Sequence, residues 1–333
     1  MTTSARTAGA PASASVPARA GLVGHPSDGF GGATLAVTLE NFRADVHAQP
    51  AQALDIAPAG DGQWPEGGLP LVSAAVVCLG RHCAASGAPY DGRARIRYAS
   101  TIPRQVGLGG SSAIVIATLR ALAPLAGAVL PQEQLPALAL SAETELGIAA
   151  GLQDRVVQTY GGLVFMDFDS EHVAEHGHGR HEPLSHELLP ELFVAWHPAA
   201  GAASGDAHAG VRERFARGER RIMRAMATLT RLAHEARAAL LAGDHAGFAA
   251  ALDAGFDVRA SVYDLDPRHS ALVGHARRLG LSATYTGSGG AIVGIAADPE
   301  AMAALERALG ADGVSVAPAL VGGGERTATS AGG

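Results

Sequence analysis

The segment that most constrains this chain is Pro103–Ser112, which reads PRQVGLGGSS and runs directly into an apolar stretch ending at Leu122. Glycines at three of the four positions 107–110 let the backbone curl so that successive N–H groups face inward and hold an anion. The serines then fall at the N-cap and first turn of a predicted helix, where unpaired N–H groups and the helix dipole favour a phosphate. Taken alone, the segment fits equally well a glycine loop that merely turns into a helix.

All 25 basic residues are arginines, and the chain contains no lysine. A Walker A loop and a protein kinase both place a lysine on the nucleotide phosphates, and Schiff-base chemistry needs a lysine amine. The sequence therefore excludes these three classes. A nucleotide bound by this chain must be held by a loop that uses no lysine.

Composition indicates a globular chain with a large core. Its 333 residues are 47% hydrophobic and 17% charged, enough for one or two domains. The net charge of −7 argues against nucleic acid or an acidic membrane surface as a partner. We expect no membrane-spanning run, a cytoplasmic location, and a monomer or homodimer. Cys78 and Cys83 should be small core residues in a reducing compartment.

Strands and helices alternate irregularly, which predicts an α+β fold of two lobes. We expect a disordered tail over 1–17, an N-terminal lobe over 18–185, a C-terminal lobe over 186–318 and a flexible tail over 319–333. Within the first lobe, residues 33–39 and 42–47 form either a strand or a hairpin pair.

Two polar stretches carry weak functional signals. Five histidines lie in the stretch 170–187, which has no cysteine and no regular helical spacing, so a solvated loop between the lobes is favoured over a zinc site. The arginines of 212–224 alternate with Glu213 and Glu219, which indicates an exposed helix face within a long helical region over 211–241.

Three ordered motifs resemble those of the GHMP kinases, the ATP-dependent kinases of small molecules such as galactose, homoserine and mevalonate. The first is Arg19–Asp28, the second is the glycine loop Pro103–Ser112, and the third is Thr286–Gly290. The likeness extends over about residues 18–315 and implies the two-lobed GHMP fold. In that fold the N-terminal lobe is like the second domain of ribosomal protein S5, and the C-terminal lobe is ferredoxin-like.

Within the GHMP family, the chain most resembles the glucuronokinases of plants. The telling segments are Ile102–Gln105 and Ala142–Arg155, the latter continuing to Phe168. His25 departs from the plant pattern, which has asparagine there. Shared runs outside the nucleotide loop imply shared handling of the substrate.

The resemblance implies ATP and Mg²⁺ as cofactors. Ser111 and Glu143 would ligate the Mg²⁺, since a hard cation takes one or two protein oxygens plus phosphate oxygens. Without the resemblance, Glu143 would be interpreted as a solvated helix carboxylate. The residues that would cradle the ATP phosphates are Pro103, Gly107, Leu108, Gly109, Gly110, Ser111 and Ser112.

Asp154 matches the family's general base, which accepts the proton of the attacking hydroxyl. Arg19 stands where other members carry lysine, and would hold Asp154 ionised and stabilise charge during transfer. The implied substrate-binding residues are Asp28, His25, Arg104, Gly287, Ser288 and Gly289. A small sugar acid would need a cation for its carboxylate, with Arg104 favoured over His25.

The resemblance therefore predicts an ATP-dependent sugar-1-kinase that phosphorylates the anomeric hydroxyl of D-glucuronate. Alternatives within the fold are kinases for galacturonate, galactose or arabinose, a decarboxylase of the diphosphomevalonate type, and a catalytically silent sugar sensor. The presence of Asp154, Glu143, Ser111 and Arg19 argues against the sensor, and the Glu143–Asp154 segment argues against the decarboxylase.

Overall fold

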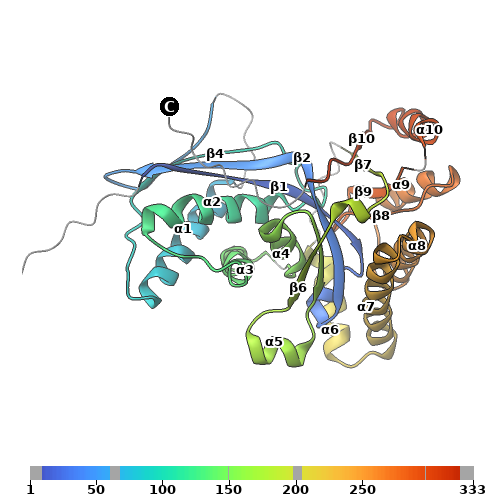
Figure 1. The fold of residues 1–333 in the computed structure, drawn as a ribbon, viewed down its shortest axis with the longest axis horizontal. Coiled ribbons are helices and arrows are strands. Elements are labelled where there is room, and N and C mark those ends of the chain that lie inside the picture. The colour runs from blue at the N-terminus through green and yellow to red at the C-terminus, as the bar shows by residue number, and fades with distance from the viewer. Residues whose placement is uncertain (1–9, 61–67, 149, 198–204, 297, 323–333) are drawn as a thin grey trace, which may run out of the picture.

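One long strand, β2 (Ala33–Pro50), organises the first sheet in the computed structural model, which describes residues 10–60, 68–148, 150–197, 205–296 and 298–322 (Figure 1). β1 (Ala12–Val23) pairs along almost all of β2. The opposite edge of β2 pairs with β5 (Leu163–Asp167) near its start and with β4 (Ala94–Ser100) near its end. The remaining strands are β3 (Asp55–Pro58), which pairs with β4, and β6 (Arg180–Leu184), which pairs with β5. The path through the sheet is therefore β3-β4-β2-β5-β6, with β1 paired to β2 outside this path.

Apolar helices cover this sheet. α2 (Gly110–Ala126) packs on β1 and β2, and it is buried over most of its length because its residues are nearly all apolar. Around it lie α1 (Gly68–Ala85), α3 (Leu135–Glu145) and α4 (Gln153–Tyr160).

A second, antiparallel sheet has the order β10-β7-β9-β8. Its strands are β7 (Leu192–Trp196), β8 (Ala283–Tyr285), β9 (Ala291–Ile295) and β10 (Ser315–Pro318). The accompanying helices are α6 (Gly205–Ala216), α7 (Arg220–Leu241), α8 (His245–Val262), α9 (Pro267–Arg278) and α10 (Pro299–Gly310). α7 and α8 pack together; α7 also lies against β2, and α8 against β1 and β8. These contacts join the two sheets.

The α+β fold class is confirmed, and several boundaries are corrected. The predicted tail over 1–17 is wrong from Ala12 onward, because residues 12–17 form the first half of β1; residues 1–9 lie outside the described part. Residues 33–50 form a single strand, so the hairpin alternative is wrong. The predicted helical region 211–241 is two helices, α6 and α7. The strands β3 and β10 were not predicted.

The histidine-containing stretch is also more regular than expected. Instead of a loop, it holds α5 (Ser170–His176), β6 and a short 3-10 turn, His186–Leu188. His181 packs edge-on against Tyr160, with ring centroids 5.2 Å apart. The chain passes from the first sheet to the second between β6 and β7. The predicted flexible tail is held at its start, where the Ala319 N–H donates to the Leu192 carbonyl; residues 323–333 lie outside the described part.

By length and composition alone, α1 could cross a membrane, contrary to the expectation from the sequence. Half of it is buried in the structure, where it packs on α2 and α3. Its two cysteines, Cys78 and Cys83, are buried and unbridged, as predicted.

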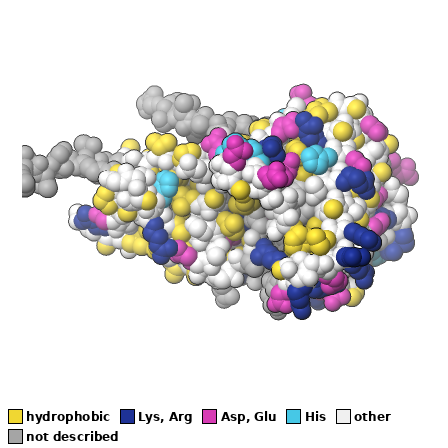
Figure 2. Space-filling view, turned by 90° about the horizontal axis from the view of Figure 1, so that it is seen from below, with side chains coloured by type: hydrophobic (Ala, Val, Ile, Leu, Met, Phe, Trp, Pro, Cys, Tyr) yellow, Lys and Arg dark blue, Asp and Glu magenta, His cyan; other side chains and the backbone are white. Residues whose placement is uncertain are grey.

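The arginines of α6 and α7 are mostly exposed and partly paired with acids, as the sequence indicated. Arg214 bonds Glu219 at 2.6 Å, and Arg217 bonds Glu213 at 3.2 Å. Figure 2 shows arginines interspersed with acidic side chains over the broad end of the molecule. Such mixed pairs offer no uniformly basic surface.

The order of residues 12–17 can be tested by truncating a side chain in the first half of β1. Val16 is fully buried and its neighbour Ser15 is exposed on the other side of the strand. We expect Val16→Ala to lower the free energy of unfolding by about 2 kcal/mol, because two methyl groups leave the core. Ser15→Ala should change it by less than about 0.5 kcal/mol. Urea unfolding curves measure both, and equal small effects would show that this half of the strand is not packed.

Candidate active site

A cavity of about 590 Å³ opens where motifs far apart in the sequence meet. Its wall includes Arg19 of β1, the glycine loop, the start of α4 with Asp154, and Gly287–Ser288 between β8 and β9. The turn Ser27–Phe30 closes the wall with Asp28. The cavity therefore draws on both sheets.

Arg19 and Asp154 form the central ion pair. Nε and Nη2 of Arg19 donate to the two carboxylate oxygens of Asp154, each at 2.6 Å. The remaining nitrogen, Nη1, donates to the carbonyls of Gly107 at 2.5 Å and Thr286 at 2.9 Å. The Arg19 side chain is 5% exposed and that of Asp154 is 23% exposed, so the pair is largely shielded while Asp154 still reaches the cavity.

The charge state of Asp154 follows from this pairing. Burial alone would raise the pKa of the Asp154 carboxyl, but the charge and hydrogen bonds of Arg19 outweigh it and hold the pKa below its ordinary value. Asp154 is therefore a fixed carboxylate at neutral pH.

The glycine loop presents the start of α2 to the cavity. Gly107 and Gly109 have φ of 77° and 74°, which residues with a side chain rarely adopt. Gly109 is the N-cap of α2, so no side chain there occupies the N–H groups of the first turn. A Cβ on Gly287 would lie 2.6 Å from the Gly107 carbonyl oxygen, so this close approach requires glycine. The N–H groups of the first turn thus face a site suited to phosphate.

Ser111 and Glu143 lie side by side beside the loop. Ser111 Oγ donates to Glu143 Oε1 at 2.7 Å, and Glu143 is fully buried. The other carboxylate oxygen accepts from Nε of Arg155 at 2.7 Å and also from Nη2 of Arg155. Arg155 thus neutralises Glu143 on the side away from Ser111.

These two oxygens fit the needs of Mg²⁺, which takes one or two protein oxygens and completes its shell with phosphate and water. Among the residues that the structure describes, no cluster of three or more His, Cys, Asp or Glu side chains could hold a metal. A metal at Ser111 and Glu143 would therefore depend on the nucleotide for its remaining ligands.

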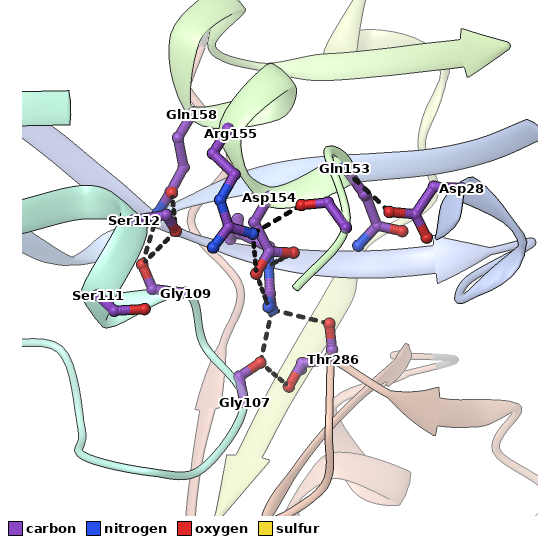
Figure 3. Close-up of polar contacts among 12 residues, drawn as sticks. Asp28, Gly107, Gly109, Ser111, Ser112, Gln153, Asp154, Arg155, Gln158 and Thr286 are labelled. Atoms are coloured by element: carbon purple, nitrogen blue, oxygen red, sulfur yellow. Dashed lines mark hydrogen bonds and ion pairs between the residues drawn. The ribbon is translucent and has the colours of Figure 1, made fainter. Parts of the chain in front are cut away.

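The far end of the cavity has a different character. Asp28 lies on the opposite side of Asp154 from Ser111 (Figure 3), and its carboxylate accepts from the Gln153 N–H at 3.2 Å. Burial raises the Asp28 pKa, although that hydrogen bond lowers it. The buried His25 has a pKa held well below its ordinary value by burial and then by the charges of Arg259 and Arg19, so its ring is neutral.

The structure brings most of the predicted site residues together. The predicted residues on the cavity wall are Arg19, His25, Asp28, Pro103, Arg104, Gly107, Leu108, Gly109, Gly110, Ser111, Asp154, Gly287 and Ser288. Glu143 lies just behind Ser111. Ser112 and Gly289 are off the wall: Ser112 is buried, with its hydroxyl 2.6 Å from Gln158 Oε1.

Sequence reasoning missed three arginines: Arg155, Arg212 and Arg259, which also line the cavity. Arg155 directly follows Asp154, and its role shows only through its contact with Glu143. Arg259 comes from α8 and lies far beyond the second motif in the sequence. Its one sequence signal is its position on the apolar face of the helix, in step with Phe248, Leu252 and Val262.

Family comparisons agree with this geometry. Residues 71–162 match the GHMP kinases N terminal domain, and residues 236–315 match the GHMP kinases C terminal domain. The chain belongs to the GHMP kinase family. It is 36% identical over 301 residues to glucuronokinase 1 of Arabidopsis thaliana, covering 83% of this chain and 82% of the relative.

Two further likenesses extend the comparison. The probable glucuronokinase 2 of the same plant is 37% identical over 302 residues, with coverage of 83% and 82%. The crystal structure of Lactococcus lactis galactokinase complexed with galactose superposes with a TM-score of 0.75 at 15% identity, covering 94% of each chain. The galactokinase likeness shows the fold alone.

Glu143 and Glu145 allow a matched test of the buried pair. Glu143→Gln keeps the side-chain size but removes the counter-charge that Arg155 contacts most closely, leaving only Asp154 at 3.8 Å, so we expect the free energy of unfolding to fall by about 3 kcal/mol. Glu145 pairs with Arg81, whose side chain is 68% exposed, and Glu145→Gln should cost less than about 1 kcal/mol. Denaturant unfolding at neutral pH gives both values. Similar losses in the two variants would contradict the assigned role of Arg155.

Proposed function

We propose that this chain is an ATP- and Mg²⁺-dependent sugar kinase that transfers the γ-phosphate to the anomeric hydroxyl of D-glucuronate, giving glucuronate 1-phosphate. The observation that carries the proposal is the position of the Arg19–Asp154 pair. On one side of the pair lies the N-terminus of α2, which suits a phosphate, and on the other side the cavity wall carries Asp28, which suits a sugar hydroxyl. The likeness to two plant glucuronokinases over most of the chain supports the choice of substrate.

The glycine loop and the start of α2 would hold the phosphates of ATP through backbone N–H groups. Ser111 and Glu143 would hold Mg²⁺, which neutralises phosphate charge during transfer. Phosphoryl transfer has a loose transition state, so the protein contributes mainly position and charge stabilisation. In this scheme the nucleotide occupies the Ser111 end of the cavity.

At the other end, Asp28 would accept hydrogen bonds from sugar hydroxyls, and Asp154 would orient the attacking hydroxyl. Because Arg19 lowers its pKa, Asp154 is a weak base, and it takes the proton late, as the bond to phosphorus forms. Arg19 holds both oxygens of the Asp154 carboxylate, so the orientation of the carboxylate is fixed before the sugar hydroxyl binds.

The first test is ADP release with a panel of acceptors: D-glucuronate, D-galacturonate, D-galactose, L-arabinose and mevalonate. We expect D-glucuronate to give the highest kcat/KM. Highest turnover with another sugar would support the kinase activity and contradict D-glucuronate as the substrate. A separate assay of CO₂ release from diphosphorylated mevalonate tests the decarboxylase, and a positive result there would replace the proposed kinase.

Replacing the central carboxylate should abolish transfer without preventing nucleotide binding. We expect Asp154→Asn to lower kcat by about 10³-fold, since the amide cannot accept the proton. Asp91→Asn, at an exposed residue outside the cavity, should retain wild-type kcat. Coupled ADP release measures kcat, and nucleotide binding by calorimetry reports an intact site. Near-normal kcat in Asp154→Asn would remove Asp154 from the mechanism.

The pH profile tests how Arg19 sets the charge of Asp154. In the wild type the lowered pKa keeps Asp154 ionised. Protonation of Asp154 should therefore not lower kcat/KM between about pH 8 and 5. In Arg19→Met the burial remains and the compensating charge is lost, so the Asp154 pKa rises and the acid limb moves to higher pH. The profile of kcat/KM for each enzyme shows the shift. An unmoved limb, with only a lower plateau, would contradict this account.

A further inference from the structure

Arg259 is a buried cation that faces the cavity without a hydrogen-bonding partner for most of its donors. The residue is 2% exposed and lies on the cavity wall. Its Nε and Nη1 atoms are buried and make no hydrogen bond. Within the described ranges, no aspartate or glutamate forms an ion pair with it. Such an arrangement costs stability unless something else neutralises the charge.

Two aromatic rings hold the guanidinium in place. Its central carbon lies 5.3 Å from the ring centroid of Tyr285 and 5.7 Å from that of Tyr263. These contacts attract the cation through the ring faces but leave the N–H donors unused. Burial lowers the pKa of Arg259 to about 10, so the group remains charged at neutral pH. The rings therefore fix a charged group whose donors remain available.

The other buried arginines of the cavity are already neutralised. Arg19 is paired with Asp154, and Arg155 is paired with Glu143. Arg104 and Arg212 are exposed to solvent, and Nη2 of Arg212 donates to the Ala150 carbonyl at 3.2 Å. Arg259 is thus the buried cation of this wall that lacks an acidic partner in the described structure.

Arg259 belongs to the sugar end of the cavity. Its charge acts on His25 and on Asp28. In Figure 3, Asp28 and Ser111 lie on opposite sides of the Asp154 carboxylate. An anion at Arg259 would therefore sit with the acceptor sugar rather than with the phosphates.

We propose that Arg259 binds the carboxylate of the sugar acid and so selects an acidic acceptor over a neutral one. The inference rests on the proposed kinase function and replaces Arg104 as the carboxylate's cation. A guanidinium can donate two parallel hydrogen bonds to a carboxylate. A neutral sugar would leave Arg259 buried and unpaired, which makes the discrimination strong.

The test compares D-glucuronate with D-glucuronamide, its neutral amide, as acceptors of the full-length enzyme. We expect the wild type to favour glucuronate by about 100-fold in kcat/KM. In Arg259→Met this ratio should fall to about 1, through a higher KM for glucuronate, while the KM for ATP stays within about twofold. Arg259→Lys keeps the charge and loses the paired donors, so its kcat/KM ratio of glucuronate to glucuronamide should be about a tenth of the wild-type ratio. This variant replaces Arg259→Met in the test if the Met variant does not fold.

Arg277→Met is the matched control. Arg277 also lies over an aromatic ring, that of Phe256 at 5.2 Å, but it is outside the cavity wall, so its variant should keep the wild-type ratio. Equal losses on both acceptors in Arg259→Met would overturn the inference, as would a selective loss in Arg104→Met instead. Failure of the proposed function is separate: it would show as wild-type enzyme that turns over no sugar acid.

Discussion

The site depends on the way Arg19 uses its guanidinium. Two nitrogens fix Asp154, and the third is not free for a substrate because it donates to the carbonyls of Gly107 and Thr286. One side chain thereby ties β1, the glycine loop, α4 and the turn after β8 into a single wall. A guanidinium suits this position because it has donors in several fixed directions, whereas an ammonium is a point charge on a flexible stem. The lobes meet at this arginine.

Charge balance then divides the cavity into two ends. Near Ser111, Glu143 is neutralised by Arg155, which leaves one carboxylate oxygen and a hydroxyl for a cation that arrives with phosphates. Near Asp28, the Arg259 cation has no such partner, and a neutral His25 adds no charge. A nucleotide–metal complex and an acidic sugar would each supply what its own end lacks. The two ends of the cavity would therefore hold the two proposed substrates on opposite sides of Asp154.

The sequence predicted the glycine-motif residues of the site better than the residues that are placed by contacts between distant elements. Glycine motifs constrain the backbone locally, so Gly107 and Gly287 could be assigned to the wall from their motifs alone. Residues 12–17 could not be assigned to a strand, because their Ala/Ser/Pro composition resembles a tail and only the long edge of β2 makes them a strand. Ser112 points to Gln158 because the helix turns its side chain inward. Arg259 is held by Tyr263 at the end of its own helix and by Tyr285 of β8, and only its place on an apolar helix face signals it in the sequence.

The absence of lysine is consistent with this design. In other nucleotide-binding classes a lysine on the phosphates supplies positive charge, whereas here Arg19, the buried arginine beside the glycine loop, is paired with Asp154. In the proposed kinase, charge developing on the transferred phosphoryl group would therefore be met by the backbone N–H groups at the start of α2 and by the Mg²⁺ that Ser111 and Glu143 would hold. Those N–H groups are fixed by Gly107 and Gly109, whose φ values no bulky residue adopts easily. The backbone conformation of the glycine loop would thus supply part of the positive charge that a lysine supplies in other nucleotide-binding classes.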